Sequence, residues 1–240
     1  MEQRASIWNF ARILASLVLC AGPAAASEPL RGVVELFTSQ ACSSCPPADR
    51  LMNEMSGDKS LVTLSYAVDY WDYTGWKDTL AIPACANRQK AYAAARGDGH
   101  VYTPQAVVGG IGHVAGADRA AIEKAVADNA PSSLKSGVRV SLGERDGALS
   151  VVVEGPDKVE PARVLVISVA REKTVVIGRG ENRGAKMTYS NVVRALADVG
   201  AYAGGKQSFS AARGDGDFHV VLVQRGEKAK PGAILAAARL

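Results

Sequence analysis

Cys42 and Cys45, separated by two serines, are the residues of this chain with the clearest capacity for chemistry. An apolar run at residues 33–37 precedes them, and a segment with a helical pattern follows at 48–55. We expect Cys42 at the start of this helix and Cys45 one turn inside it. At the helix start Cys42 would meet free backbone N–H groups and the positive end of the helix dipole, which favour the thiolate. Because the thiolate is the reactive form, the spacing predicts a thiol–disulfide exchange site whose two cysteines can form a disulfide.

Other kinds of site are compatible with the same two cysteines. A structural zinc site would need a second cysteine pair or two histidines at ligand spacing, and His100, His113 and His219 have no such spacing. We therefore expect no zinc site and assign no metal-ligating residue. A permanent structural disulfide remains open, as does capture of a soft metal ion such as Cu(I) by Cys42 and Cys45.

The N-terminal 26 residues have the pattern of a secretory signal peptide. Arg4 and Arg12 supply positive charge, residues 13–21 form a short apolar core, and the alanines at 24–26 fit a cleavage site. The apolar core is shorter than the roughly 20 residues that a transmembrane helix needs, and an uncleaved anchor is the alternative. We therefore expect export to a periplasmic or secreted location, where disulfides persist.

The charge of the chain is mild and scattered. The formal net charge is +4 over 240 residues, and no basic cluster stands out. This pattern does not fit a nucleic-acid-binding protein. After the N-terminal segment the sequence has no other long apolar run, so we expect no stable membrane insertion once the signal peptide is removed.

Cys85 is the third cysteine of the exported part of the chain. If Cys42 and Cys45 pair with each other, Cys85 stays free. Free cysteine is among the residue types most often buried, so we favour a buried small residue near the start of a helix. A third thiol able to attack the first pair is the alternative.

Strand-like and helix-like segments alternate over residues 30–131. Strands are expected at residues 33–37, 61–66, 102–108 and 111–115, and helices at 48–55, 84–96 and 118–127. Such alternation is typical of an α/β domain, and about 100 residues is a usual domain size.

The composition changes after residues 131–133, which have the composition of a linker. Short strand-like segments separated by turns follow at residues 138–142, 149–153, 164–169, 174–177, 218–223 and 234–238. Residues 191–199 also fit helical spacing, although their neighbours resemble strands. We expect residues 135–240 to form an all-β sandwich domain.

The order of these features resembles the thioredoxin superfamily: a Cys-x-x-Cys pair at a helix start, a later Thr-Pro at a strand start, a hairpin and a closing helix. The resemblance implies an α/β thioredoxin-like domain at residues 30–131, followed by the all-β sandwich domain. It implies that Cys42 is the attacking thiol and Cys45 the resolving thiol. It also implies a cis bond between Thr103 and Pro104, which would support a substrate strand beside the cysteines.

Several short motifs spread over the chain resemble an uncharacterised secreted family, domain of unknown function 1223. They lie at residues 34–40, 42–49, 68–72, 75–78, 102–105 and 180–182. The family brings an expected fold but no known reaction. The chain departs from the family pattern at Ala67, where His is frequent, and at Cys85, where Phe is frequent.

Trp71, Asp72 and Trp76 belong to an aromatic and acidic stretch that follows the strand at 61–66. We expect this stretch at the same end of the sheet as Cys42. The tryptophans could be contact anchors in the wall of a substrate groove. An ordered loop that packs against the second domain is the alternative.

Glu35 and residues 179–184 have open interpretations. Glu35 lies in an apolar strand beneath Cys42, where a buried carboxylate could relay protons, but we favour a side chain that points to solvent at a strand edge.

Residues 179–184 are polar and glycine-rich. They favour a simple turn over a partner-binding loop.

Together these features predict an exported thiol–disulfide oxidoreductase that acts on protein thiols or disulfides without a bound cofactor. The predicted catalytic residues are Cys42 and Cys45, and the predicted substrate-binding residues are Thr103, Pro104, Trp71, Asp72 and Trp76. The alternatives are a copper-binding protein that uses the same cysteines and a non-catalytic binding scaffold with a structural disulfide.

Overall fold

The computed structural model describes residues 30–240, except for the side chains of residues 130–135. The predicted signal peptide at residues 1–26 lies outside the described residues. No helix within residues 30–240 is long and apolar enough to cross a membrane.

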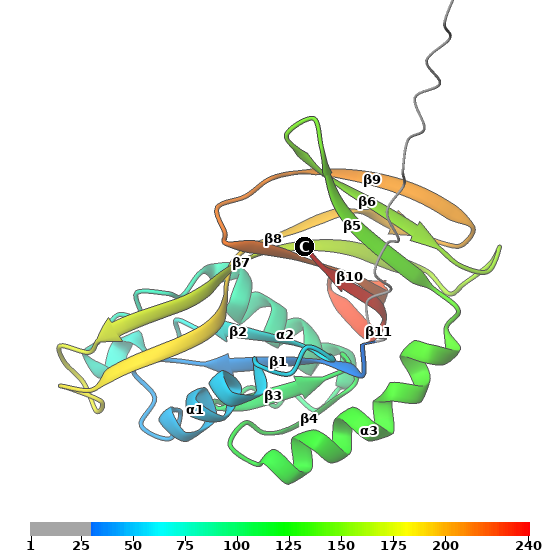
Figure 1. Ribbon diagram of the computed structural model, residues 1–240. Coiled ribbons are helices and arrows are strands. Elements are labelled where there is room, and N and C mark those ends of the chain that lie inside the picture. The colour runs from blue at the N-terminus through cyan, green and yellow to red at the C-terminus, as the bar shows by residue number, and fades with distance from the viewer. Residues whose placement is uncertain (1–29) are drawn as a thin grey trace, which may run out of the picture.

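The described residues form three α-helices, one short 3-10 helix and eleven strands (Figure 1). The helices are α1 (Pro46–Met55), α2 (Pro83–Arg96), α3 (Arg119–Lys135) and the 3-10 helix η1 (Asp72–Thr74). The strands are β1 (Gly32–Thr38), β2 (Leu61–Ala67), β3 (Gln105–Val108), β4 (Gly112–Ala115), β5 (Arg139–Arg145), β6 (Ala148–Glu154), β7 (Ala162–Val176), β8 (Lys186–Tyr202), β9 (Lys206–Ala212), β10 (Phe218–Glu227) and β11 (Lys230–Arg239). The α-helices α1 and α2 lie close to the predicted ranges. The helix α3 runs on to Lys135, so the prediction of a linker at residues 131–133 is wrong, because these residues belong to the helix.

Eight strands form one mixed sheet in the order β11-β10-β7-β8-β2-β1-β3-β4. The prediction of an α/β thioredoxin-like domain followed by an all-β sandwich domain is therefore wrong, because strands from both parts of the chain belong to this sheet. The two halves join where Ser65 of β2 pairs in parallel with Val192 of β8. Two hydrogen bonds support the junction: Ser65 Oγ donates to the Ser190 carbonyl at 2.8 Å, and Asn191 Nδ2 donates to Thr63 Oγ1 at 2.9 Å.

One buried core also spans both parts of the chain. Phe37 and Tyr66, from β1 and β2, belong to the same cluster as Ile167 of β7 and Leu222 of β10. The helix α2 contributes Tyr92 to this cluster and contacts strands of both halves. Figure 1 shows α2 between the two halves of the sheet. Separating the halves would expose this common core to water, which is why they do not behave as independent layers.

The burial of β7 and β10 explains why the predicted sandwich is wrong. Residues 164–170 and 219–224 are buried without alternation. In a two-layer sandwich, every second residue of such strands would face solvent. Here α2 covers one face of these strands, and a three-stranded sheet of β5, β6 and β9 covers the other. A strand with both faces covered has a continuous apolar run, as these two do.

The two edges of the large sheet approach each other at the turn between β3 and β4. The Ile234 N–H of β11 donates to the Gly109 carbonyl at 2.9 Å. Gly110 adopts φ 73°, and a Cβ atom there would lie 2.5 Å from the Gly232 carbonyl oxygen. Glycine at this position therefore permits the close approach, and the sheet curves around α2.

Candidate functional site

Cys42 and Cys45 form a disulfide, with their Cα atoms 5.4 Å apart. Cys45 is the N-cap residue of α1, and Pro46 opens the helix. The strand β1 ends at Thr38, so residues 39–45 lead directly from the sheet into the helix. We call these residues the cysteine loop. Proline has no N–H and a fixed φ, which suits the first turn of a helix and fixes where α1 begins. The predicted disulfide is present, but the expected position of the helix is wrong: Cys45, not Cys42, lies at the helix N-terminus, and Cys42 lies three residues before it.

Both cysteines of the pair are buried. Cys42 is 2% exposed and Cys45 is fully buried, whereas Ser43 and Ser44 between them face solvent. The Sγ of Cys42 lies 3.4 Å from the hydroxyl oxygen of Ser44. A substrate would therefore meet the serines first, and the sulfurs need a local movement to become accessible.

A loop from the C-terminal part of the chain contacts the cysteine loop. It comprises residues 177–185, between β7 and β8, and we call it the capping loop. The side-chain amide of Asn182 donates to the carbonyl oxygens of Gln40 and Cys42, both at 2.9 Å. The favoured interpretation of residues 179–184 as a simple turn missed this contact. The polarity of Asn182 signals a hydrogen bond, but its sequence position gives no partner.

Trp76 lies between the cysteine loop and the capping loop. Its indole N–H donates to Gln40 Oε1 at 2.8 Å. A Cβ atom on Gly178 would lie 2.9 Å from the Trp76 ring, so the glycine lets the capping loop approach the ring closely. Gln40 is also held by Asp78, whose carboxylate accepts the Gln40 N–H at 2.8 Å. The aromatic and acidic stretch thus contacts both loops.

Trp71 and Asp72 occupy the adjoining positions. The Trp71 indole N–H donates to Thr103 Oγ1 at 2.7 Å, and the Asp72 carboxylate accepts the Asp78 N–H at 3.0 Å. The peptide bond between Thr103 and Pro104 is cis. These contacts connect Trp71 to Thr103, and they connect Asp72 and Trp76 to the residues around Gln40. Pro104 is next to Thr103 in the chain.

Thr103 and Pro104 lie at the same end of the sheet as the cysteine loop. Phe37 of β1 pairs with Gln105 of β3 in antiparallel register. Thr103 and Pro104 precede Gln105, and the cysteine loop follows β1, so both segments leave the sheet at this end.

Asp49 is a buried carboxyl group that the sequence interpretation missed. It is 2% exposed, and the Thr38 hydroxyl donates to its Oδ1 at 2.7 Å. Its Oδ2 has no hydrogen-bond partner within the part of the chain that the structure describes. Burial is the main cause that raises the pKa of Asp49 to about 7, and the Thr38 hydrogen bond opposes it. The sequence feature that could have identified Asp49 is its place, as an acidic residue, on the apolar side of a short helix.

Cys45 and Asp49 lie one helical turn apart. The Asp49 N–H donates to the Cys45 carbonyl at 3.1 Å. Cys45 already has helical angles, φ −77° and ψ −34°, so residues 45 and 49 share a face of α1. The site therefore pairs a disulfide with a carboxyl group that can gain or lose a proton near neutral pH.

Glu35 is buried rather than exposed, so the favoured prediction of a solvent-facing side chain is wrong. Its two carboxylate oxygens accept hydrogen bonds from Arg88, one from Nε at 2.7 Å and one from Nη2 at 3.0 Å. The Tyr92 hydroxyl also donates to Glu35. Because Arg88 and Tyr92 come from α2, Glu35 fastens this helix to β1. These contacts favour a structural role over a proton relay to the cysteines.

Cys85 is free and fully buried in the shared core. Burial raises the pKa of its thiol to about 12. The thiolate is therefore scarce at neutral pH, which matches the favoured interpretation of a buried small residue.

Comparisons with known proteins give a family and a similar structure. The model of a family described as protein of unknown function (DUF1223) matches residues 33–224. The crystal structure of protein AGR_C_4864 from Agrobacterium tumefaciens is similar, with a TM-score of 0.78 and 34% sequence identity. The similarity covers 90% of this chain and 96% of that chain. No curated protein matches the chain.

Proposed function

The chain belongs to the DUF1223 family of proteins of unknown function, and from its own residues we propose that it exchanges thiols and disulfides at Cys42 and Cys45. One observation carries this proposal. The disulfide lies at the N-terminus of α1, with the unpaired carboxyl oxygen of Asp49 buried one turn away. The helix terminus stabilises a thiolate, and the carboxyl group provides a proton acceptor.

In the reducing direction, the Cys42 thiolate attacks one sulfur of a substrate disulfide. The other substrate sulfur leaves as a thiolate and takes up a proton from water. The Cys45 thiol then gives its proton to the Asp49 carboxylate, and the Cys45 sulfur attacks Cys42 in the mixed disulfide. This step closes the Cys42–Cys45 bond and releases the second substrate thiolate. An external dithiol reduces the pair again, and the reverse sequence oxidises a substrate dithiol.

We propose that a substrate reaches the sulfurs when the capping loop moves. Asn182 holds this loop on the carbonyl oxygens of Gln40 and Cys42, and both sulfurs are buried beneath the surface. Loss of two neutral hydrogen bonds costs about 1–3 kcal/mol, which thermal fluctuation supplies in a minor fraction of molecules. A substrate strand could replace Asn182 as the partner of these carbonyl groups.

We propose protein thiols or disulfides as the substrates, in the periplasm or outside the cell. The location rests on the predicted signal peptide at residues 1–26. Trp71, Asp72 and Trp76, with Thr103 and Pro104, are the proposed contacts for the substrate. They support this role because their contacts group around Gln40 and at the same end of the sheet.

A trapping experiment tests the proposed chemistry. The Cys45→Ser variant, reduced and mixed with a disulfide-bonded peptide, should accumulate a mixed disulfide at Cys42 that mass spectrometry identifies. The Cys42→Ser variant is the matched control and should trap far less, since we propose Cys42 as the attacking thiol and Cys45 is the fully buried residue of the pair. Absence of the adduct in a folded Cys45→Ser variant would contradict the proposal.

An inert structural disulfide is the second candidate, and the burial of both cysteines favours it. In that case the bond would act by restricting the unfolded chain. A loop this short stabilises a protein by about 2 kcal/mol on the chain-entropy estimate. Dithiothreitol would then reduce the wild-type pair only at the rate of global unfolding, and the Cys42→Ser variant would show a loss of stability alone.

A further inference from the structure

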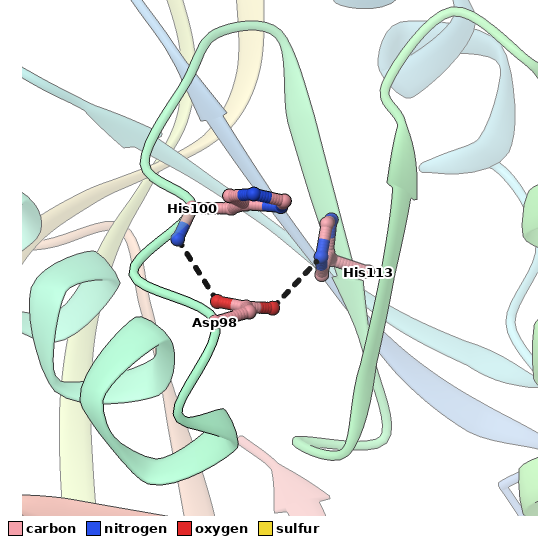
Figure 2. Close-up of side chains that lie close together, drawn as sticks. All are labelled: Asp98, His100 and His113. Carbon is pink, nitrogen blue, oxygen red and sulfur yellow. Dashed lines mark hydrogen bonds and ion pairs between the residues drawn. The ribbon is translucent and has the colours of Figure 1, made fainter.

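Asp98, His100 and His113 lie close together (Figure 2). Asp98 and His100 belong to the loop between α2 and β3, and His113 belongs to β4. One ligand atom from each residue lies within 4.8 Å of the other two. The histidines have no ligand spacing in the sequence, because it is the β3–β4 hairpin that brings His113 to the other two residues: His113 pairs with Val107 of β3.

The end of α2 places the Asp98 carboxylate. Gly97 ends the helix in the left-handed region, at φ 76°. Arg96 Nε donates to Asp98 Oδ2 at 2.7 Å, and Arg96 Nη2 donates to Oδ1 at 3.2 Å. The His100 backbone N–H donates to Oδ1 at 2.9 Å. The carboxylate is therefore fixed before any ion arrives.

The ring of His113 is held from its other side. Its Nδ1 lies 2.8 Å from the Tyr102 hydroxyl, and its Nε2 lies 3.3 Å from Asp98 Oδ2. A hydroxyl group can donate to Nδ1 or accept from it, so Tyr102 accommodates both neutral tautomers of the ring. With the proton on Nδ1, the Nε2 lone pair faces Asp98. A ligating histidine is commonly oriented by such a hydrogen bond on its second nitrogen.

The distances suit a small divalent ion. Ligand distances of about 2.0–2.2 Å around a tetrahedral ion separate the ligand atoms by roughly 3.4 Å. The Asp98 Oδ2 and His113 Nε2 atoms are already 3.3 Å apart. The His100 side chain is exposed, and its ring meets that of His113 edge to face at 6.3 Å between centroids. Rotation of the exposed His100 ring would turn its nitrogen toward an ion held by Asp98 and His113.

We propose that Asp98, His100 and His113 bind a divalent transition-metal ion of the first row, with water in the remaining positions. Two imidazole nitrogens and one carboxylate oxygen suit Zn²⁺, Cu²⁺ and Ni²⁺, and Cu²⁺ binds tightest in the general order of affinities. Three protein ligands at an exposed position leave at least one site for water or another small ligand. This site is independent of the cysteines and does not rest on the proposed exchange chemistry.

Arg96 determines which ions the site accepts. Its guanidinium neutralises the Asp98 charge, so the site has little net negative charge to attract a cation. Mg²⁺ and Ca²⁺ depend on charged oxygen ligands and gain little here. The imidazoles of His100 and His113 supply most of the affinity, which selects ions that prefer nitrogen.

A titration followed by nuclear magnetic resonance tests the site. The full chain, with the Cys42–Cys45 disulfide closed and its imidazoles labelled with ¹⁵N, is titrated with Zn²⁺ and in parallel with Mg²⁺. The ring signals of His100 and His113 should shift together and saturate at one equivalent of Zn²⁺. Those of His219, a buried histidine outside the cluster, should stay unchanged. Mg²⁺ should move none of them.

Variants link the binding to these side chains. His100→Ala removes an exposed ring and should weaken Zn²⁺ binding at least tenfold in calorimetry, with little effect on folding. Asp128→Asn, an exposed aspartate of α3, is the matched control and should bind as the wild type does. The proposal is overturned if His100 and His113 do not shift at twofold excess of Zn²⁺. Wild-type affinity in a folded His100→Ala variant, or equal binding of Mg²⁺, also overturns it.

Discussion

Asn182 donates a hydrogen bond to the carbonyl oxygen of Cys42, although the two residues are 140 positions apart in the chain. The contact brings a turn of the C-terminal part onto the loop that carries the disulfide. The long β7–β8 hairpin is thereby in direct contact with the loop of the proposed site.

Replacement of Asn182 should expose the disulfide. Asn182→Ala removes both hydrogen bonds to the cysteine loop, so we expect dithiothreitol to reduce the pair several-fold faster under native conditions. The expected loss of stability is about 1–3 kcal/mol. Asn53→Ala is the matched control, since Asn53 also makes two hydrogen bonds to β8 but lies further along α1. Equal reduction rates in the two variants would contradict a capping role for Asn182.

Asp49 should give the protein a characteristic pH dependence of stability. Its pKa is about 7 in the folded state, against an ordinary value of 3.8. Between these values the unfolded chain releases the proton while the folded protein keeps it, so stability falls as the pH rises from about 4 to 7. By pH 8 the raised pKa of Asp49 lowers the free energy of unfolding by about 4 kcal/mol relative to its value below pH 4.

Urea unfolding of Asp49→Asn at pH 5 and pH 8 measures this effect. The amide cannot ionise, so the variant should lose much less stability between the two pH values than the wild type does. Asp58→Asn is a useful comparison, because hydrogen bonds from Ser60 and Arg31 lower the pKa of Asp58. The Asp58 contribution is present above its unfolded pKa and lost as the pH falls. Identical pH slopes for Asp49→Asn and wild type would contradict a raised pKa.

The sequence predicted the local elements of the site but not its surroundings. Cys42, Cys45 and the helix α1 follow from short-range signals: a strand, two cysteines and Pro46 at a helix start. The burial of Glu35 and the partner of Asn182 depend on α2 and on the capping loop, which are remote in the chain. No local pattern specifies such partners.

The predicted fold class was wrong because it, too, depends on contacts between residues that are remote in the chain. An apolar run such as residues 164–169 fits a strand of either sheet architecture, and periodicity does not say which strand lies beside it. Residues 191–199 fit helical spacing, yet they lie in β8. The pairing of β8 with β7 shifts register at Arg194, between the pairs Ser168–Ala195 and Val169–Val193, and this shift interrupts the strand alternation. The mixed sheet arises from long-range pairing that the sequence pattern does not encode locally.

The Cys85 thiol should be unreactive toward alkylating reagents in the folded protein. Its thiol is buried and its pKa is raised to about 12, so iodoacetamide should label Cys42 in the reduced protein long before Cys85. Peptide mapping by mass spectrometry after timed labelling measures both positions, and labelling in urea confirms that Cys85 reacts once unfolded. Native labelling of Cys85 at the rate of Cys42 would support the alternative of a third active thiol.

The ion pair of Glu35 and Arg88 should be among the most sensitive contacts of the core. Arg88→Met leaves the Glu35 carboxylate buried without its cation, and breaking such a pair costs about 3–5 kcal/mol. The double variant Glu35→Leu with Arg88→Met removes both charges and should recover part of this loss. Arg119→Met is the matched control, because its ion pairs with Glu54 and Glu123 are exposed and contribute about 0–1 kcal/mol each. Chemical denaturation that gives equal losses for Arg88→Met and Arg119→Met would show that the pair does not hold α2 on the sheet.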